Sequence, residues 1–341
     1  MYSVTGRIGK IKQPWGGYLK RRDFNTIQLD DQIKLHEEEN IYPALIGLAV
    51  DYLTRFMMGT PVEKAFEISC LGAEIAKEKK NAMSLLGKIK GLDKKSVSAA
   101  CKVVGYDVCF RAGMGGFKPV SEINPDDATI ENIITMVKRG ITFWGEYGPI
   151  ILDGFTFEGG YTAIISTGDG DYLTKDTLWD FKVLKEEPRA KYTLQLLVYY
   201  IMGMHSIHKE FKTIKYLGIF NPRFNKIYRY PVKSISEDVI KTVSHDVIGY
   251  GWTKEEYLAF KKKEFPLLFE LQTPKETLGN RAVKEVGSLK IGDRVYHKRF
   301  GNGTILLLEE YPSKVNSFAT AKVLFDSGET KIVITNFIEK V

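Results

Sequence analysis

The chain is poor in cysteine, with only three among its 341 residues. Three thiols are too few for a disulfide framework, and an iron–sulfur cluster held by four thiolates would need one more. Disulfide-stabilised secreted proteins and cluster-bearing enzymes are therefore set aside. A reduced, cytoplasmic location is the expectation.

Long hydrophobic runs are absent as well. The longest apolar stretches, such as Leu196–Met204, are far shorter than the ~20 residues that cross a bilayer. The polar start of the sequence does not resemble a signal peptide. The chain also lacks the Gly-x-x-x-x-Gly-Lys-Ser/Thr loop that binds nucleotide phosphates. We therefore expect neither a membrane protein nor a motor that hydrolyses its own nucleotide.

The composition that remains is that of an ordinary globular protein. Hydrophobic residues make up 44% and charged residues 27%, and 49 Lys plus Arg against 42 Asp plus Glu give a formal charge of +7. A mild positive balance permits a polyanionic partner, although a solvated basic surface is the plain interpretation. At ~150 residues per domain, the length predicts about two domains.

Hydrophobic periodicity divides the chain. Helical spacing predicts one helix from Ile41, a second over Val62–Lys80 and a third over Ala128–Lys138. Lysines are frequent between Lys77 and Lys102. Within this stretch Ile89–Lys95 resembles a helix-hairpin-helix DNA clamp, but Asp93 takes the place of the motif's second glycine, and a solvated helix pair is the plain interpretation. The pattern predicts an α/β protein with an arm and helical region over 1–147, a core over 148–271, a linker over 272–288 and a small β-domain over 289–341.

Within the core, a short hairpin brings acidic residues together. If Asp171–Thr174 and Thr177–Lys182 pair as antiparallel strands with Leu173 opposite Leu178, then Asp171 lies opposite Asp180 on one face. Facing carboxylates repel each other unless a cation lies between them, and hard oxygen ligands suit Mg²⁺ or Mn²⁺. Lys182 shares this face with Asp180, where an ammonium would assist phosphodiester hydrolysis. A charged hairpin tip without any function is the alternative.

A polar pair interrupts the apolar helix expected over Tyr192–Met204. Gln195 and Tyr199 are four residues apart, so they lie on one helical face. A glutamine among apolar neighbours needs a hydrogen-bond partner inside the protein. Gln195 either has a functional role or, in the structural alternative, is hydrogen-bonded to the backbone.

Three short motifs occur in order along this region: Gly168-x-x-Asp171, Asp180-x-Lys182 and Gln195-x-x-x-Tyr199. Over roughly residues 148–232 the chain therefore resembles the PD-(D/E)xK nuclease superfamily, and within it the RecB-like branch. The resemblance implies a restriction-endonuclease-like core and Mg²⁺-dependent cleavage of DNA. It also implies that Asp171 and Asp180 hold the metal with the Phe181 carbonyl, that Lys182 orients or activates the water, and that Gln195 and Tyr199 line the DNA path.

One element of the family pattern departs from expectation. RecB-like enzymes usually carry a histidine on an upstream helix, whereas this chain has Asp51 four residues after Gly47. Asp51 could serve as a hard metal ligand, and Glu74 on the next helix competes for that role. For each of these two residues, the alternative to a metal ligand is an acidic side chain that lies in solvent on the surface of its helix.

The C-terminal segment has a resemblance of its own. Ile291–Ile305 is similar to the start of the Tudor-like β-barrel that ends UvrD/PcrA-type helicases, with Phe300 filling a small core. The resemblance implies an SH3/Tudor-like barrel that docks on a protein partner such as a helicase or RNA polymerase. The basic pair Lys298 and Arg299 would also tolerate DNA, and a stabilising appendage is the alternative.

The sequence thus predicts a Mg²⁺- or Mn²⁺-dependent deoxyribonuclease with a module that binds a partner or DNA. The alternative is a catalytically degenerate adaptor that binds DNA or RNA polymerase. An RNA substrate, endo- or exonucleolytic action, and a role in repair, phage defence or mobile elements all stay open.

Overall fold

The computed structural model describes residues 1–264, 281–283, 285–286, 288–297, 300–311, 318–326, 330–335 and 338–341. It divides into two compact units, Met1–Trp252 and Thr253–Val341. Most of the predicted linker over 272–288, together with Lys298 and Arg299, lies outside the described residues.

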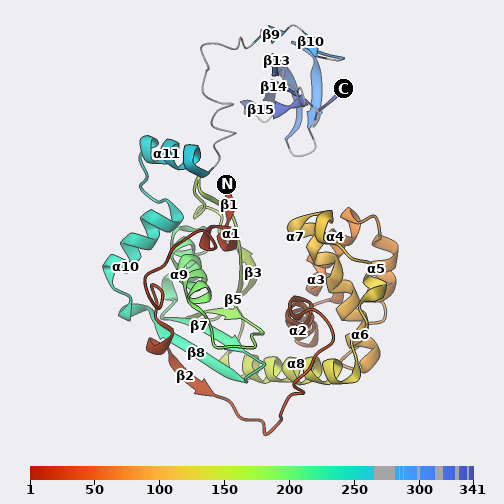
Figure 1. The fold of residues 1–341 in the computed structure, drawn as a ribbon, viewed down its shortest axis with the longest axis vertical. Helices are drawn as coiled ribbons and strands as arrows, with labels where there is room; N and C mark the ends of the chain where they lie inside the picture. Colours follow the sequence, from red (N-terminus) through yellow and green to blue (C-terminus); the bar gives the residue numbers. More distant parts are fainter. Residues whose placement is uncertain are drawn as a thin grey trace. The chain divides into compact units, whose positions relative to one another are not determined.

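The first unit is built on a six-stranded sheet (Figure 1). In spatial order its strands are β2 (Asn25–Gln28), β8 (Lys226–Pro231), β7 (Tyr216–Asn221), β6 (Thr177–Phe181), β5 (Asp169–Leu173) and β3 (Leu152–Thr156). β6 and β7 run parallel, and the other neighbouring strands run antiparallel. A parallel pair needs a crossover, which α9 (Ala190–His205) supplies.

Helices cover both faces of this sheet. From α8 (Asp127–Tyr147), the Phe143 ring stacks on Phe220 with centroids 4.0 Å apart, and Trp144 packs on Tyr172 at 4.6 Å. Trp179 on β6 also contacts Phe143. Because side chains alternate along a strand, the residues next to Tyr172 on β5 and next to Trp179 on β6 point to the other face of the sheet, toward α9. The hairpin thus has one aromatic face under α8, and an opposite face toward α9 on which the two aspartates lie beside the buried Leu173 and Leu178.

Residues at the start of the chain complete the sheet unit. β1 (Tyr2–Ser3) pairs in parallel with β4 (Ile165–Thr167), α1 (Val4–Ile8) packs on α9, and β2 forms an edge of the central sheet. A Cβ on Gly168 would lie 2.6 Å from Val4 Cγ2, so α1 packs closely against the Gly-x-x-Asp motif. The segment expected as an arm therefore belongs to the packed core.

The helical lobe, which we define as α2–α7, lies beside the sheet (Figure 1). Its members are α2 (Pro43–Met57), α3 (Val62–Ala65), α4 (Glu67–Ile75), α5 (Lys79–Leu86), α6 (Lys94–Val103) and α7 (Asp107–Ala112). The single helix predicted over Val62–Lys80 is broken at Phe66, whose buried ring packs edge-on against Tyr52, and again before Lys79, where Lys77 has a φ of 60°. Tertiary packing of Phe66 and this left-handed turn outweigh the continuous helical pattern.

α8 joins the lobe to the sheet. It extends nine residues beyond the predicted end at Lys138, and its apolar residues belong to one hydrophobic core that reaches from α2 to Trp179 and Phe220. Short 3₁₀ turns lie at Arg21–Asp23, Val104–Tyr106, Met114–Gly116, Val120–Glu122, Lys209–Thr213 and Val232–Ser234.

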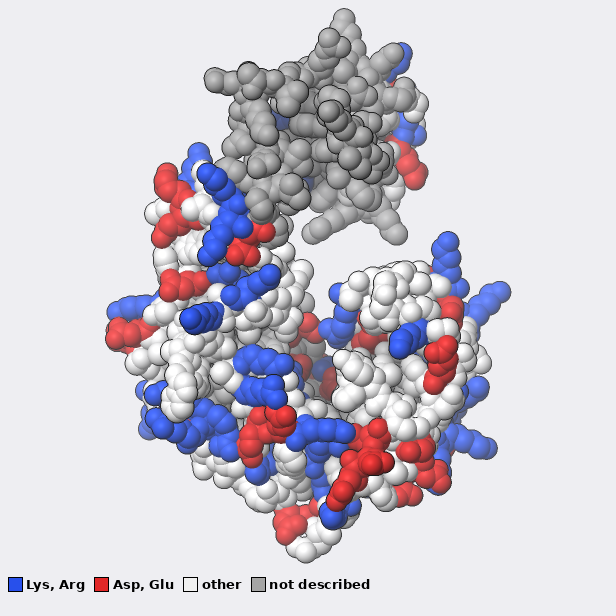
Figure 2. Space-filling view, viewed as in Figure 1, with Lys and Arg blue, Asp and Glu red and all other residues white. Residues whose placement is uncertain are grey.

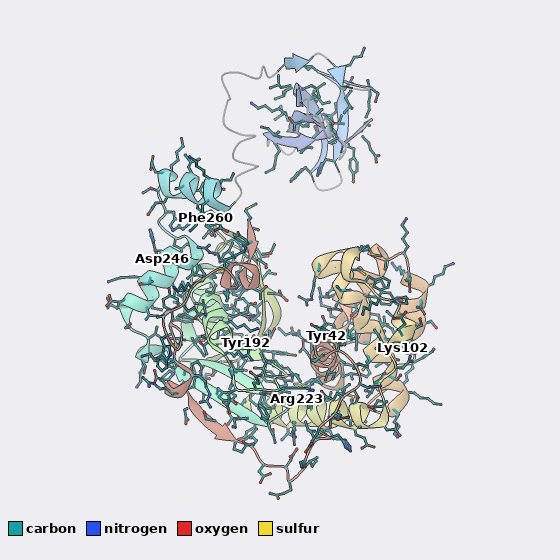
Figure 3. All side chains as sticks on the ribbon, viewed as in Figure 1. Tyr42, Lys102, Tyr192, Arg223, Asp246 and Phe260 are labelled. Atoms are coloured by element: carbon teal, nitrogen blue, oxygen red, sulfur yellow. The ribbon has the colours of Figure 1, made fainter. Side chains whose placement is uncertain are left out.

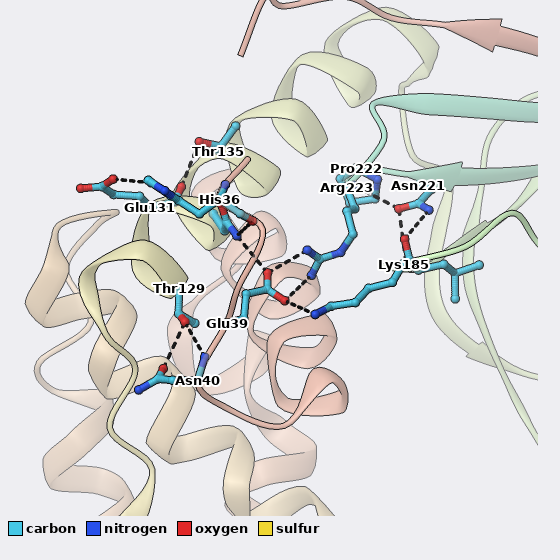
Figure 4. A network of polar contacts seen from close by, with 12 residues as sticks. His36, Glu39, Asn40, Thr129, Glu131, Thr135, Lys185, Asn221, Pro222 and Arg223 are labelled. Atoms are coloured by element: carbon cyan, nitrogen blue, oxygen red, sulfur yellow. Dashed lines mark hydrogen bonds and ion pairs between the residues drawn. The ribbon is translucent and has the colours of Figure 1, made fainter. Parts of the chain in front are cut away.

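A buried carboxylate also links the two parts (Figure 4). The Glu39 side chain is 1% exposed and lies 2.8 Å from Arg223 Nη1 and 3.3 Å from Lys185 Nζ. Asn132 on α8 donates to its Oε1 at 3.1 Å. Burial raises the pKa of Glu39, but Arg223 and the other donors outweigh this effect and lower it below its ordinary value.

The helical stretch predicted over 236–271 is divided in the structure. It forms α10 (Glu237–Thr242), a π-helical turn (Val243–Ile248) and α11 (Lys254–Glu264), and residues 265–271 lie outside the described part. Arg7 holds the π-turn on the core, because its guanidinium donates to the carbonyls of Val247 at 2.9 Å and Asp246 at 2.6 Å.

Beyond α11, the second unit contains one antiparallel sheet that curls into a half-barrel. In spatial order its strands are β15 (Thr330–Ile334), β14 (Phe318–Phe325), β13 (Gly301–Tyr311), β12 (Arg294–His297) and β16 (Ile338–Lys340), and β9 (Arg281–Val283) pairs with β13. Two further strands, β10 (Glu285–Val286) and β11 (Leu289–Lys290), pair with each other outside this sheet. Phe300 packs against the core of this sheet, as the sequence predicts. The mixed α/β class is confirmed, and the nuclease-type core and closed Tudor-like barrel stay predictions.

Among the described residues, no helix has the length and apolar character needed to cross a membrane.

Candidate active site

The hairpin of β5 and β6 has the predicted register. Tyr172 pairs with Trp179 and Leu173 with Leu178, and the Thr174 N–H donates to the Thr177 carbonyl at 3.0 Å. The strand bounds differ slightly, since β5 begins at Asp169. This register carries Asp171 to the position opposite Asp180.

At Asp171 the two strands part. Its Oδ2 accepts a hydrogen bond from the Phe181 N–H at 2.8 Å, and the backbone pairing between the strands ends at Tyr172 and Trp179. A side-chain carboxylate therefore takes the place of a backbone acceptor. This bond fixes the Asp171 carboxylate beside the backbone that carries Asp180.

Three of the predicted residues meet at this point. Lys182 Nζ lies 2.7 Å from Asp180 Oδ1 and 3.8 Å from Asp171 Oδ2. The Asp180 side chain is fully buried, whereas those of Lys182 and Asp171 are 22% and 23% exposed. The ammonium thus lies against both carboxylates, and the cluster meets solvent through Asp171 and Lys182.

Burial and charge set the protonation of this cluster. Burial raises the pKa of Asp180 to about 7; Lys182 opposes this shift, while the Asp171 carboxylate adds to it. For Lys182, burial lowers the pKa of the ammonium, but the two carboxylates outweigh this effect and the net shift is upward. Lys182 therefore stays protonated at neutral pH.

Gln195 and Tyr199 bind each other on α9. Gln195 Nε2 donates to the Tyr199 hydroxyl at 2.9 Å, and both side chains are buried. The Tyr199 ring stacks on Phe157 with centroids 5.0 Å apart. Burial raises the pKa of Tyr199; Lys182 lowers it, and the nearby carboxylates raise it further. The pair therefore lies at the acidic cluster, and its role in a DNA path stays a prediction.

Asp51 is held by other partners. Its Oδ1 accepts hydrogen bonds from the Tyr172 hydroxyl and from Arg55 Nε, the latter at 3.2 Å. Tyr172 points to the opposite face of β5 from its neighbour Asp171. In the part of the chain that the structure describes, no group of three or more His, Cys, Asp or Glu side chains is placed to hold a metal ion. The structure therefore brings Asp171 and Asp180 together without Asp51.

Two further groups are predicted as metal ligands, the Glu74 carboxylate and the Phe181 carbonyl. Glu74 on α4 pairs with Lys79 Nζ at 2.5 Å on the surface of the helical lobe. The Phe181 side chain packs in the core beside Phe220, and its N–H binds Asp171. A carbonyl ligand at Phe181 stays a prediction.

One atom of the cluster lacks a partner. Among the described residues, Asp180 Oδ2 is buried without a hydrogen bond. A buried carboxylate oxygen without a donor is costly, and a cation would remove that cost. Mg²⁺ commonly binds through one or two carboxylates, completed by water and substrate phosphate. The two aspartates therefore fit a hard divalent ion.

Two arginines that the sequence analysis did not select border the site. Arg55 lies over the Tyr172 ring at 4.5 Å and pairs with Asp153 on β3 at 3.3 Å. Arg111 on α7 reaches Asp169 at the start of β5, at 3.8 Å. The four-residue spacing of Asp51 and Arg55 is a sequence signal for their pair, whereas nothing local to Arg111 indicates its contact.

These arginines connect the helical lobe with the β3–β5 edge of the sheet. Figure 2 shows a hollow between the two parts of the first unit.

Neither a protein-family profile, nor a curated protein, nor a solved structure matches this chain. What the site can do follows from its own geometry.

Proposed function

We propose that this protein is a metal-dependent nuclease that hydrolyses phosphodiester bonds in DNA. The observation that carries the proposal is the cluster of Asp171, Asp180 and Lys182, in which a buried aspartate oxygen lacks a hydrogen bond among the described residues. Facing carboxylates with one oxygen left over form an incomplete coordination site. A bound cation would supply the partner that this oxygen lacks.

The two aspartates would hold the ion. Mg²⁺ or Mn²⁺, when bound there, polarises the scissile phosphate and lowers the pKa of the attacking water. Asp171 is fixed for this role by the Phe181 N–H, and Asp180 by the sheet on either side of β6.

Lys182 would act on the substrate. Because its carboxylate neighbours keep it protonated, it serves as a donor and not as a general base. A protonated lysine at the mouth of the cluster can donate to a phosphate oxygen and stabilise the negative charge that develops there. Its partial exposure lets a phosphate reach it.

The Gln195–Tyr199 pair would act by positioning. Both side chains are buried, so they support the cluster from the α9 side and keep that face polar. The hydrogen bond between them would hold that side of the cluster in one arrangement.

A second candidate is a non-catalytic adaptor that binds nucleic acid or a polymerase. The observation in its favour is Asp51, whose carboxylate is bound by Arg55 and Tyr172. A site limited to two acids binds a divalent ion more weakly than one with three. The alternative predicts binding without cleavage.

Cleavage by an Asp180→Asn variant tests the proposal. Plasmid and linear DNA are incubated with wild type, the variant and a matched control, Asp176→Asn, in Mg²⁺, Mn²⁺ or EDTA. Asp176 lies in the turn of the same hairpin, where it pairs with Arg229 at 3.1 Å. We expect metal-dependent cleavage by wild type and control and none by Asp180→Asn. Equal cleavage by all three chains would contradict the assignment, and binding without cleavage by wild type would favour the adaptor.

For the second unit we propose a docking role. Several apolar side chains on its strands are exposed, among them Leu306, Leu324 and Ile332. The resemblance of this segment to a helicase module favours a protein partner, for which a helicase or an RNA polymerase is the proposal, and these side chains are candidates for the contact. Pull-down of each candidate with wild type and with an Ile332→Ser variant tests it.

A further inference from the structure

A basic surface feature lies on the helical lobe, outside the hairpin site. An open recess of about 500 Å³ between α5 and α6 is lined by Lys88, Lys94, Lys95 and Lys102, together with Leu85, Ser98 and Ala99. Figure 3 labels Lys102 on this lobe. We call these four lysines and the space between them the lysine recess.

The local charge is far from balanced. Residues 79–102 contain seven lysines and one acid, Asp93, a net charge of +6, whereas the whole chain has +7. The carboxyl of Asp93 is itself engaged, because it accepts from the N–H groups of Lys95 and Ser96 as the N-cap of α6. This short segment therefore carries a strong local excess of positive charge.

Most of these ammonium groups have no acidic partner. Lys94 pairs with Asp127 at 2.8 Å, whereas within the described ranges Lys88, Lys95 and Lys102 have no carboxylate within 4.0 Å. Some surface lysines elsewhere in the protein do have one, such as Lys64 with Glu67 at 2.6 Å. Uncompensated like charges repel one another and create a field that attracts anions.

The recess is also held rigid. The turn between the helices is fixed by Ser96 Oγ, which accepts from the N–H groups of Lys90 at 2.9 Å and Gly91 at 3.3 Å. Lys95 and Lys102 lie two turns apart on one face of α6, with the small residues Ser98 and Ala99 between them. Small side chains leave room for a ligand to approach, and the fixed backbone turn holds the two helices that carry the lysines in one arrangement.

We propose that the lysine recess binds the sugar–phosphate backbone of double-stranded DNA, independently of base sequence. Lysines act as point charges toward phosphates and carry no sequence information by themselves. The recess is open, as an extended polyanion requires. The choice of DNA as the polyanion rests on the proposed function, whereas the charge argument does not.

Binding without metal tests this inference separately from cleavage. A triple variant, Lys88→Gln, Lys95→Gln and Lys102→Gln, is compared with wild type in EDTA, by fluorescence anisotropy with a 30-base-pair duplex over a range of salt. A matched control replaces three ion-paired lysines, Lys34→Gln, Lys64→Gln and Lys241→Gln, and so removes the same charge. Thermal melts show that all chains are folded.

If the three lysines contact phosphates, the slope of log K against log salt falls by about 2 to 3 in the triple variant, since each contact contributes roughly 0.9. Affinity at low salt falls by ~10-fold or more. The control keeps the wild-type slope. A triple variant that binds like the control overturns the inference, as does a lysine-dependent preference for polyglutamate over DNA, which would indicate an acidic protein as the ligand. If the lysine recess binds DNA as expected but the wild-type protein does not cleave DNA, the proposed nuclease activity is refuted and the inference about the recess stands.

Discussion

The two aspartates of the hairpin differ in their surroundings. Asp171 is partly exposed and accepts a backbone N–H, whereas Asp180 is buried with Lys182 as its donor. The ammonium lies against both carboxylates and reduces their repulsion in the metal-free protein. A divalent ion would have to compete with Lys182 for Asp180.

The stability of the metal-free protein reports the state of Asp180. The folded-state pKa of about 7 lies above the ordinary 3.8, so the stabilisation from its protonated form is present below about pH 4 and lost as pH rises through 7. Urea unfolding in EDTA should show wild type losing stability relative to Asp180→Asn between pH 4 and 8, by at most about 4 kcal/mol. Parallel pH profiles for the two chains would contradict the raised pKa.

Removal of the lysine should separate metal binding from catalysis. In Lys182→Met the competing ammonium is gone, so we expect Mn²⁺ to bind as tightly as in wild type or severalfold more tightly. Cleavage should fall by about 10²-fold or more, because the donor to the phosphate is lost. Calorimetric Mn²⁺ titration and cleavage rates measure the two effects. Lost Mn²⁺ binding with cleavage preserved would show that the roles are reversed.

At the scale of elements, the chain that leaves β6 is anchored on both sides. The side-chain amide of Asn221, at the end of β7, donates from Nδ2 to the Leu184 carbonyl at 3.0 Å and accepts at Oδ1 from the Leu184 N–H at 3.3 Å. Lys185, three residues beyond Lys182, pairs with the buried Glu39. The position of Lys182 therefore depends on the segment before α2 and on the β7–β8 turn.

Glu39→Gln should weaken this anchor. Loss of the buried charge leaves Arg223 and Lys185 without their carboxylate, which typically costs about 3 kcal/mol. The control, Glu37→Gln, removes an exposed acid paired with Lys34 at 3.5 Å and should change stability by less than about 0.5 kcal/mol. Chemical denaturation measures both. Equal stability of the two variants would show that the Glu39 network does not hold the lobes.

For the whole molecule, the division into two units predicts separable roles. Residues 1–252 contain the complete hairpin cluster, α9 and the lysine recess. A chain shortened to residues 1–271 should therefore fold and cleave DNA in vitro at close to the full-length rate. Cleavage by the two chains at equal concentration, with size-exclusion profiles, gives the test. A shortened chain that is monodisperse but binds DNA far more weakly would place the second unit on the DNA-binding surface.

The local geometry of the site follows from the order of residues along the chain. Strand alternation and a short turn fix which residues of β5 and β6 face one another, and a four-residue helical spacing places Gln195 beside Tyr199. These relations span fewer than a dozen residues, so the backbone period alone decides them.

The surroundings of the site depend on contacts between segments that are far apart in the chain. The edge strand β2 pairs with β8 about 200 residues away, and Arg55, Tyr172 and Asp51 meet only because α2 packs on the sheet. The break of the predicted 62–80 helix at Phe66 likewise depends on the Tyr52 ring. No local period encodes such contacts, because they depend on which apolar faces pack together when the whole chain folds.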